Sequence, residues 1–456
     1  MKKYIVSFLI LFCSIINAQH SIKGLLSPNI ESDWLIVYKI EGTKQVFVNN
    51  TKIKTDSILV NGIKKEVGKF EITLPSSAKP GSYRATYRLE GAGFVDFIYN
   101  KEDVSFAFNP NYPNQTVSFS KSEENKLFNN YITSLSITQQ KLDSMQIAVL
   151  QNTKLDLKKP YKDTYNKLIA INNDYLAKAK GKFVYPLIKA SLRNNSPEIL
   201  TNTENYMSRM KNTFFDKIDF SDKTLINSSF LINRILDYVF FINYSDDKKT
   251  QQILYKSSIE KVLSKIDSQI FKRDIIMFLI DQFEAYKNFG IIDYLFKNHY
   301  DKLPSSLKDN NYKKEKIAAF ASEIGRIAPD FSWSENGRNF KLSTLNDAEK
   351  YVLVFWSTSC SHCLREIPEL HSFMKNKKGI KVIAFALENS EFAWKQYSNT
   401  NLRGWYNVLG LNKWKNKTAR TYQVNSTPTY FILDKNKKII AKPYEFVDVK
   451  AFFEKQ

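Results

Sequence analysis

Residues 351–363 read YVLVFWSTSCSHC, and this stretch decides the fold of the C-terminal part of the chain. Its first six residues form a continuous apolar run, which is typical of a parallel strand buried on both faces. After the second cysteine, apolar residues recur at helical spacing, at Leu364, Ile367, Leu370, Phe373 and Met374. The pattern predicts a strand, a short turn and a helix that begins at the first cysteine, Cys360.

Two cysteines at this position predict a reactive dithiol. The unpaired N–H groups and the dipole of a helix N-terminus stabilise a thiolate, so we expect Cys360 to be the nucleophile. Cys363 lies one turn further along and can attack a mixed disulfide formed at Cys360. Half of a zinc site is the alternative interpretation, but zinc needs four ligands, and the chain has three cysteines and four histidines in all. We therefore expect redox chemistry with no metal and no cofactor.

The first 18 residues have the pattern of an export signal. Two lysines precede an apolar core over residues 4–16, and a cleavage site follows at Ala18. An uncleaved membrane anchor is the alternative, although the core is short for a bilayer span. Cleavage removes Cys13 and leaves the close-spaced pair as the only cysteines, which is not the pattern of a disulfide-stapled scaffold. We expect a periplasmic protein.

The composition indicates a multidomain globular protein. The chain has 456 residues, of which 43% are hydrophobic and 25% charged. Its formal net charge is +21, but the lysines are scattered along the whole chain and no nucleic-acid motif accompanies them. We therefore expect no nucleic acid partner; solubility, or attraction to an anionic envelope surface, explains the charge better.

Three patterns divide the mature chain. Residues 19–120 alternate apolar and polar side chains between turn signals such as Asn61-Gly62, which predicts an antiparallel β-sandwich-like domain. Residues 121–322 have a helical period and predict an all-α region, whose apolar stripes we assign to its core. In this region Ser196-Pro197 has the pattern of a helix start. In residues 323–456 strands alternate with helices, which predicts an α/β domain with a mostly parallel sheet.

Motifs spread over this last segment match one known family. The matching residues are Ile327-Ala328-Pro329-Asp330-Phe331, Phe355-Trp356, Cys360-Ser361-His362-Cys363, Glu366, Pro368 and Thr427-Pro428-Thr429-Tyr430-Phe431-Ile432-Leu433-Asp434. The segment resembles the TlpA/ResA-like branch of the thioredoxin superfamily. The resemblance implies a thioredoxin-like fold, thiol-disulfide oxidoreductase activity on protein disulfides, and a membrane electron donor that re-reduces the pair. The leading regions resemble those of exported proteins of this type more loosely, and no activity follows for them.

The resemblance also assigns residues around the dithiol. Thr427 and Pro428 match a cis-proline loop that faces the cysteines and pairs with an extended substrate strand. Val354 occupies the position of the buried aspartate that serves as proton acceptor in thioredoxins proper. Glu366, three residues after Cys363 on the same helix, can supply the missing base. The alternative for Glu366 is a solvated position on an amphipathic helix.

Two questions stay open at this stage. His362 can stabilise the Cys360 thiolate and make the pair more oxidising, or it can be an exposed bystander. Its presence favours an oxidant, whereas the family resemblance favours a reductant, and we give the reductase more weight. A different class of function is an envelope binding protein, in which the leading regions grip a protein or glycan and the redox domain is an accessory.

Overall fold

The computed structural model of the chain describes residues 19–455, except residues 89, 90 and 92. The predicted signal peptide, residues 1–18, lies outside the described residues. The chain divides into two compact units, and the division falls inside helix α9 (Gln269–Ala285), after Ile280. Among the described helices, none combines the length and the apolar character that crossing a membrane requires.

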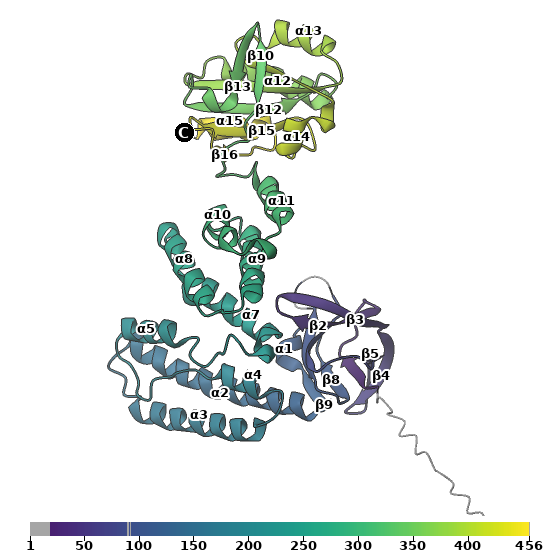
Figure 1. Cartoon of the computed structure of the whole chain (residues 1–456), viewed down its shortest axis with the longest axis vertical. Coiled ribbons are helices and arrows are strands. Elements are labelled where there is room, and N and C mark those ends of the chain that lie inside the picture. Colours follow the sequence, from purple (N-terminus) through teal and green to yellow (C-terminus); the bar gives the residue numbers. More distant parts are fainter. Residues whose placement is uncertain (1–18, 89–90, 92, 456) are drawn as a thin grey trace, which may run out of the picture. The chain divides into compact units, whose positions relative to one another are not determined.

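The first unit begins with a β domain of two sheets (Figure 1). Its strands are β1 (Ser21–Leu26), β2 (Trp34–Glu41), β3 (Lys44–Lys52), β4 (Lys54–Val60), β5 (Ile63–Thr73), β6 (Gly81–Thr86), β7 (Phe94–Tyr99), β8 (Val104–Phe108) and β9 (Ser118–Lys121). One sheet has the order β4-β5-β1-β8-β9 and the other β3-β2-β6-β7. Neighbouring strands are antiparallel, except that β1 pairs with β8 in parallel.

The two sheets share one hydrophobic core, as a sandwich requires. Alternate residues of the strands that form the core face inward, so Phe106 of the first sheet meets Phe97 of the second with ring centroids 5.8 Å apart. Most aromatic side chains of this domain fill that core, among them Tyr83, Tyr87 and Tyr99. The predicted β-sandwich-like domain is confirmed, with one parallel strand pair in addition.

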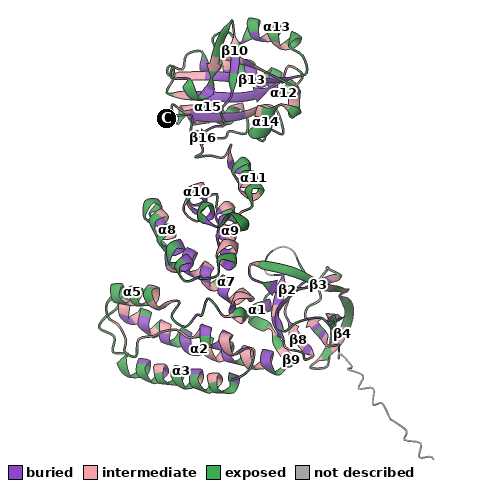
Figure 2. Ribbon diagram, in the orientation of Figure 1, coloured by how far each residue is buried: buried purple, intermediate pink, exposed green. Residues whose placement is uncertain are grey.

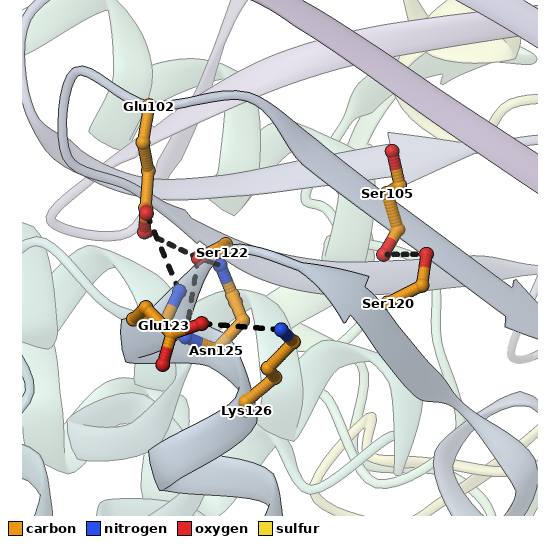
Figure 3. A network of polar contacts seen from close by, with 7 residues as sticks. All are labelled: Glu102, Ser105, Ser120, Ser122, Glu123, Asn125 and Lys126. Carbon is orange, nitrogen blue, oxygen red and sulfur yellow. Dashed lines mark hydrogen bonds and ion pairs between the residues drawn. The ribbon is translucent and has the colours of Figure 1, made fainter.

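A polar network ties the β domain to the helix that follows it (Figure 3). Ser122 caps helix α2 (Glu123–Gln151) by accepting from the Asn125 amide, and it donates to Glu102 at 2.5 Å. The buried Asn125 side chain accepts from the backbone N–H of Ile98 (2.8 Å) and donates to the backbone carbonyl of Ile98 (2.6 Å). It therefore takes the place of a neighbouring strand for one residue of β7.

The middle of the chain is helical, as predicted. Its helices are α2, α3 (Lys158–Ala179), α4 (Tyr185–Ser191), α5 (Thr203–Thr213), α6 (Lys223–Ile226), α7 (Ser229–Leu236), the π-helix η1 (Asp237–Ile242), α8 (Lys248–Ser264) and α9, whereas the short α1 (Pro113–Thr116) lies between β8 and β9 of the β domain. The prediction that a helix starts at Ser196-Pro197 is wrong. Residues 192–202 are irregular, because side chains of α2 and α3 bind their backbone in place of helical hydrogen bonds.

The second unit carries short helices and then an α/β domain. The helical part comprises α10 (Phe289–Asn298), η2 (Tyr300–Lys302), η3 (Ser305–Leu307) and α11 (Asn310–Phe320). The α/β domain comprises β10 (Ser332–Glu335), β11 (Arg338–Lys341), η4 (Leu342–Thr344), β12 (Lys350–Trp356), α12 (Ser361–Met374), β13 (Ile380–Glu388), α13 (Phe392–Asn401), β14 (Tyr406–Leu411), η5 (Lys413–Lys415), α14 (Lys417–Thr421), β15 (Thr429–Asp434), β16 (Ile439–Ala441) and α15 (Phe446–Glu454). The side chain of Gln423 donates to the carbonyls of Ala318 and Ala319, at 3.2 and 2.7 Å. These bonds attach the end of α11 to the α/β domain.

The central sheet of this domain has the order β14-β13-β12-β15-β16. Alternate residues of β12 enter two separate cores: Leu353 and Phe355 lie in one, Val354 and Trp356 in the other. Both faces are therefore covered (Figure 2), which explains the continuous apolar run. The predicted α/β fold is confirmed, but the expectation of a mostly parallel sheet is wrong. β15 runs antiparallel to both β12 and β16, while β12, β13 and β14 are parallel.

Candidate active site

The dithiol lies where β12 gives way to α12. Cys360 is the N-cap residue of α12, and its Sγ accepts a hydrogen bond from the backbone N–H of Cys363 at 3.2 Å. The preceding loop is fixed from two sides: the carboxylate of Glu388, at the end of β13, accepts from the Thr358 N–H at 2.5 Å, and Lys413 donates to the Ser359 hydroxyl at 2.9 Å. The strand, the turn and the helix are therefore where the sequence predicts them.

The two thiols differ in exposure. Both cysteines are free, and their sulfur atoms lie 2.6 Å apart. Cys363 is fully buried in the core beneath α12, whereas Cys360 is partly exposed. An external reagent can therefore reach Cys360 first.

The two thiols also differ in acidity. Burial acts to raise the pKa of Cys360, but hydrogen bonds from the Cys363 thiol and from the backbone N–H groups of Cys363 and His362 outweigh it, so the pKa falls below its ordinary value. Burial raises the pKa of the Cys363 thiol to about 12, and the neighbouring Cys360 acts in the same direction. The exposed sulfur is thus the better thiolate and the buried sulfur holds its proton.

The loop that precedes β15 lies beside Cys360 and completes the site. The Thr427–Pro428 peptide bond is cis, as predicted. The Thr427 carbonyl lies 3.2 Å from Cys360 Sγ and accepts its thiol hydrogen bond. The structure thus brings together four of the residues selected from the sequence, Cys360, Cys363, Thr427 and Pro428.

Glu366 is buried on the inner face of α12, with 7% of its surface exposed. Its Oε2 accepts hydrogen bonds from the Tyr430 hydroxyl (3.0 Å) and from the backbone N–H of Phe446 (2.9 Å). In the described part of the chain, no hydrogen bond joins Glu366 to either cysteine. Burial raises the pKa of Tyr430, and the charges of Glu366 and of the two cysteines act in the same direction.

The remaining selected residues lie at the surface. His362 is exposed and makes no hydrogen bond or ion pair with another described side chain, and its backbone N–H is one of the groups that lower the pKa of Cys360. Pro368 lies inside α12 on its exposed side. The described residues hold no cluster of three histidine, cysteine or carboxylate side chains suited to a metal ion.

Three residues of this site received no role in the sequence analysis: Glu388, Lys413 and Tyr430, of which only Tyr430 lies in a quoted motif. They come from β13, η5 and β15, and only the order of the sheet brings them near the dithiol. The available signal is weak. Glu388 is a carboxylate directly after a buried strand, and Tyr430 stands two residues after the cis-proline.

Comparison with known proteins places this segment among redox proteins. Residues 348–439 match a protein-family model described as thioredoxin-like. The thiol-disulfide oxidoreductase ResA of Bacillus anthracis is 29% identical over 121 residues, which cover 26% of this chain and 68% of that protein. A thioredoxin-like protein of Haemophilus influenzae is 31% identical over 101 residues, covering 22% and 58%. A solved domain of a possible thiol-disulfide isomerase from Cytophaga hutchinsonii is 32% identical, covering 29% of this chain and 91% of that one, with a TM-score of 0.26.

Proposed function

Because the C-terminal domain of this chain belongs to the thioredoxin superfamily, we propose that the protein is a thiol-disulfide oxidoreductase acting on protein disulfides. The observation that carries the proposal is the contrast between the two thiols. A partly exposed Cys360 with a lowered pKa lies 2.6 Å from a fully buried Cys363 with a raised pKa. The Cys360 sulfur is suited to attack a substrate disulfide, whereas the Cys363 sulfur stays protonated until a mixed disulfide has formed.

In the first step the Cys360 thiolate attacks one sulfur of a substrate disulfide. The substrate S–S bond breaks, a mixed disulfide forms at Cys360, and the departing substrate thiolate takes up a proton. The cis-proline loop supports this step, because the Thr427 carbonyl beside Cys360 can pair with an extended substrate strand.

In the second step Cys363 loses its proton and attacks Cys360 Sγ. A disulfide forms between Cys363 and Cys360, the mixed disulfide breaks, and the second substrate sulfur leaves as a thiolate that takes up a proton, so two electrons have passed from the pair to the substrate. Because the pKa of Cys363 is about 12, the step needs a proton acceptor, and we assign this role to Glu366. The Tyr430 hydroxyl, which donates to Glu366 and whose pKa the charges of both cysteines raise, is the group we assign to relay the proton.

Net reduction of substrates is the direction we propose. A membrane electron donor would then restore the dithiol, and the export signal would place the protein in the periplasm. The reverse direction uses the same atoms, and we assign His362 the part of tuning the potential of the pair. Titration of wild type and His362→Ala against glutathione measures that potential. An unchanged value would remove His362 from the site.

Insulin reduction with dithiothreitol tests the activity, and trapping in cells tests the roles of the two sulfurs. Cys363→Ser should accumulate mixed disulfides with partner proteins, because the attacking thiol remains and the resolving thiol is gone. Cys360→Ser is the matched control and should accumulate none. Equal trapping by the two variants, or a wild type that fails to reduce insulin, would refute the proposal.

A further inference from the structure

The helical region of the first unit contains a cavity of about 270 Å³, and none of its lining residues belongs to the unit that carries the dithiol. Its walls come from α2, α3, α5, α7 and the irregular segment 192–202. Its volume is close to the lower limit of known ligand pockets, about 300–1,000 Å³. The cavity is therefore large enough for a small molecule and too small for a peptide segment.

The irregular wall of the cavity is held in a fixed shape. Gln146 of α2 binds Leu200 twice: its side chain donates to the Leu200 carbonyl at 2.6 Å and accepts from the Leu200 N–H at 2.9 Å. Tyr161 of α3 donates to the Ser196 carbonyl at 3.0 Å. These bonds pair backbone N–H and C=O groups of a segment that forms neither helix nor strand. The wall of the cavity is therefore preformed, and a ligand does not have to order this segment when it binds.

Three arginines line the cavity, and their charges are unequally compensated. Arg193 forms an ion pair with Asp143 at 2.8 Å. Arg209 donates to the backbone carbonyls of Asn194 (3.0 Å) and Asn195 (3.2 Å) and has no carboxylate partner among the described residues. Two aspartates, Asp143 and Asp237, thus stand against three guanidinium groups, which leaves one positive charge in excess.

Arg234 is the least satisfied of the three. Its contact with Asp237 is long, at 3.5 Å, and its buried Nε has no hydrogen-bond partner in the described chain. Burial lowers the pKa of Arg234, and the charge of Arg193 acts in the same direction. A buried donor without an acceptor costs free energy, which an anionic oxygen in the cavity would recover.

Apolar side chains complete the lining. The ring of Phe214 lies under the Arg234 guanidinium, with 3.9 Å between its centroid and Cζ. Leu142 of α2 is buried, and Met210 of α5 lies on the same cavity. A ligand held here meets cationic donors at one place and hydrocarbon or aromatic surface at another.

We propose that this cavity binds a small organic monoanion, a carboxylate with a short apolar or aromatic body. A single carboxylate matches the single excess charge, and its two oxygens fit the fork of a guanidinium group. The apolar lining suits the rest of such a ligand and does not suit inorganic phosphate. The proposal is independent of the redox chemistry, because every lining residue lies in the first unit.

Calorimetry on the full mature chain with three probes tests the proposal. Benzoate should bind one to one, with a Kd of about 1 mM or lower as befits a ligand of its size. Benzamide, which has the same shape without the charge, should bind at least about tenfold more weakly. Inorganic phosphate should show no saturable binding at the same concentrations.

Two arginine variants locate the binding site. Arg234→Met should weaken benzoate binding at least about tenfold, because it removes a charged donor and keeps the apolar stem. Arg273→Met is the matched control: it removes the same charge from a side chain of equal exposure (24% in both) that does not line the cavity. Benzoate affinity should then change by less than about twofold.

Several results would overturn the proposal. They are equal affinity for benzoate and benzamide, saturable binding of phosphate alone, and the same loss of affinity in both arginine variants. Absence of binding by all three probes to the folded wild type would do so too. Because the benzoate and benzamide comparison uses the wild type, the test stands even if Arg234→Met does not fold.

Discussion

At the scale of single residues, the buried carboxylate of Glu366 connects α12 to β15 and α15 through its two hydrogen bonds. Glu366→Gln keeps an oxygen for the Tyr430 and Phe446 donors, so the fold should survive. Resolution of the mixed disulfide should slow on the order of a hundredfold near neutral pH, because the proton acceptor is gone. Stopped-flow thiol exchange measures this rate.

Glu369→Gln, on the exposed side of the same helix, is the matched control and should resolve at the wild-type rate. If both variants behave like wild type across the pH range, Glu366 has no part in proton transfer and serves the packing of α12 alone.

The Cys363 thiol links redox state to stability at alkaline pH. Its pKa is about 12 in the folded protein and returns to its ordinary value of 9.0 on unfolding. The unfolded chain therefore releases this proton first, so the stability linked to the thiol is fully present below pH 9 and is lost as the pH rises toward 12. We expect the free energy of unfolding of the reduced protein, from urea titrations, to fall between pH 9 and 11.

Cys363→Ala isolates this effect from buried tyrosines that titrate in the same window, such as Tyr351. The alanine variant should lose less stability over these two pH units than the reduced wild type. Parallel curves would show that the thiol is not protonated as described.

At the scale of secondary-structure elements, one side chain of α2 bonds directly to the backbone of β7. Asn125 is 3% exposed, and it satisfies both backbone polar groups of Ile98. Asn125→Ala leaves these buried groups unpaired, which should cost about 2–3 kcal/mol of unfolding free energy. Asn130→Ala, at an exposed position of the same helix, should stay within about 0.5 kcal/mol of wild type. Urea denaturation of the two variants measures the difference, and equal stability would contradict the role given to Asn125.

The elements that the sequence predicts well are those whose burial produces a regular pattern of apolar residues within the element itself. β12 is buried on both faces, so its apolar run is visible without any tertiary knowledge. Edge strand β14 carries a weaker pattern, because its sequence, YNVLGL, mixes polar and apolar residues and only two of its six residues are buried. The wrong helix start at Ser196-Pro197 has a related cause. Local capping chemistry favours a helix there, and the long-range bonds from Gln146 and Tyr161 override it.

The same distinction divides the two sites. Cys360, Cys363 and Glu366 share one helix, so their spacing in sequence reports their spacing in space. Glu388 and Tyr430 come from other strands, and their nearness to the dithiol depends on the order of the sheet. The arginines of the cavity are separated in sequence and lie on different elements, and no local pattern distinguishes them from solvated charges.

At the scale of the whole molecule, the regions before the redox domain are expected to select its partners. A dithiol attacks almost any accessible disulfide, so selectivity must come from surface beyond the active site. A chain starting at Ser322 should fold and should reduce insulin about as well as the full chain, because the α/β domain has its own core. When both chains carry Cys363→Ser and are used to trap mixed disulfides in cells, the short chain should recover fewer partner proteins than the full chain.

A second chain, starting at Asp281, is a useful control for this comparison. It keeps α11, and with it the bonds from Gln423 to Ala318 and Ala319 that the shorter chain loses. It should therefore be the more stable of the two, while the two should trap the same reduced set of partners. Recovery of the full set by either truncated chain would show that selectivity resides in the redox domain.

The parallel pairing of β1 with β8 constrains the order in which the β domain of such a chain can fold during export. β1 is the first described strand, yet it lies inside its sheet, between β5 and β8. Its partners arrive late: Ser21 pairs with Thr73, and Ile22 pairs with Val104. If such a chain crosses a membrane N-terminus first, as proposed, β1 can pair with β5 early, but its other edge stays unpaired until Val104 has emerged, so this sheet cannot be completed before β8 arrives. During that interval the edge of β1 that will meet β8 keeps its hydrogen-bonding groups open, and an open strand edge of this kind can pair with another chain.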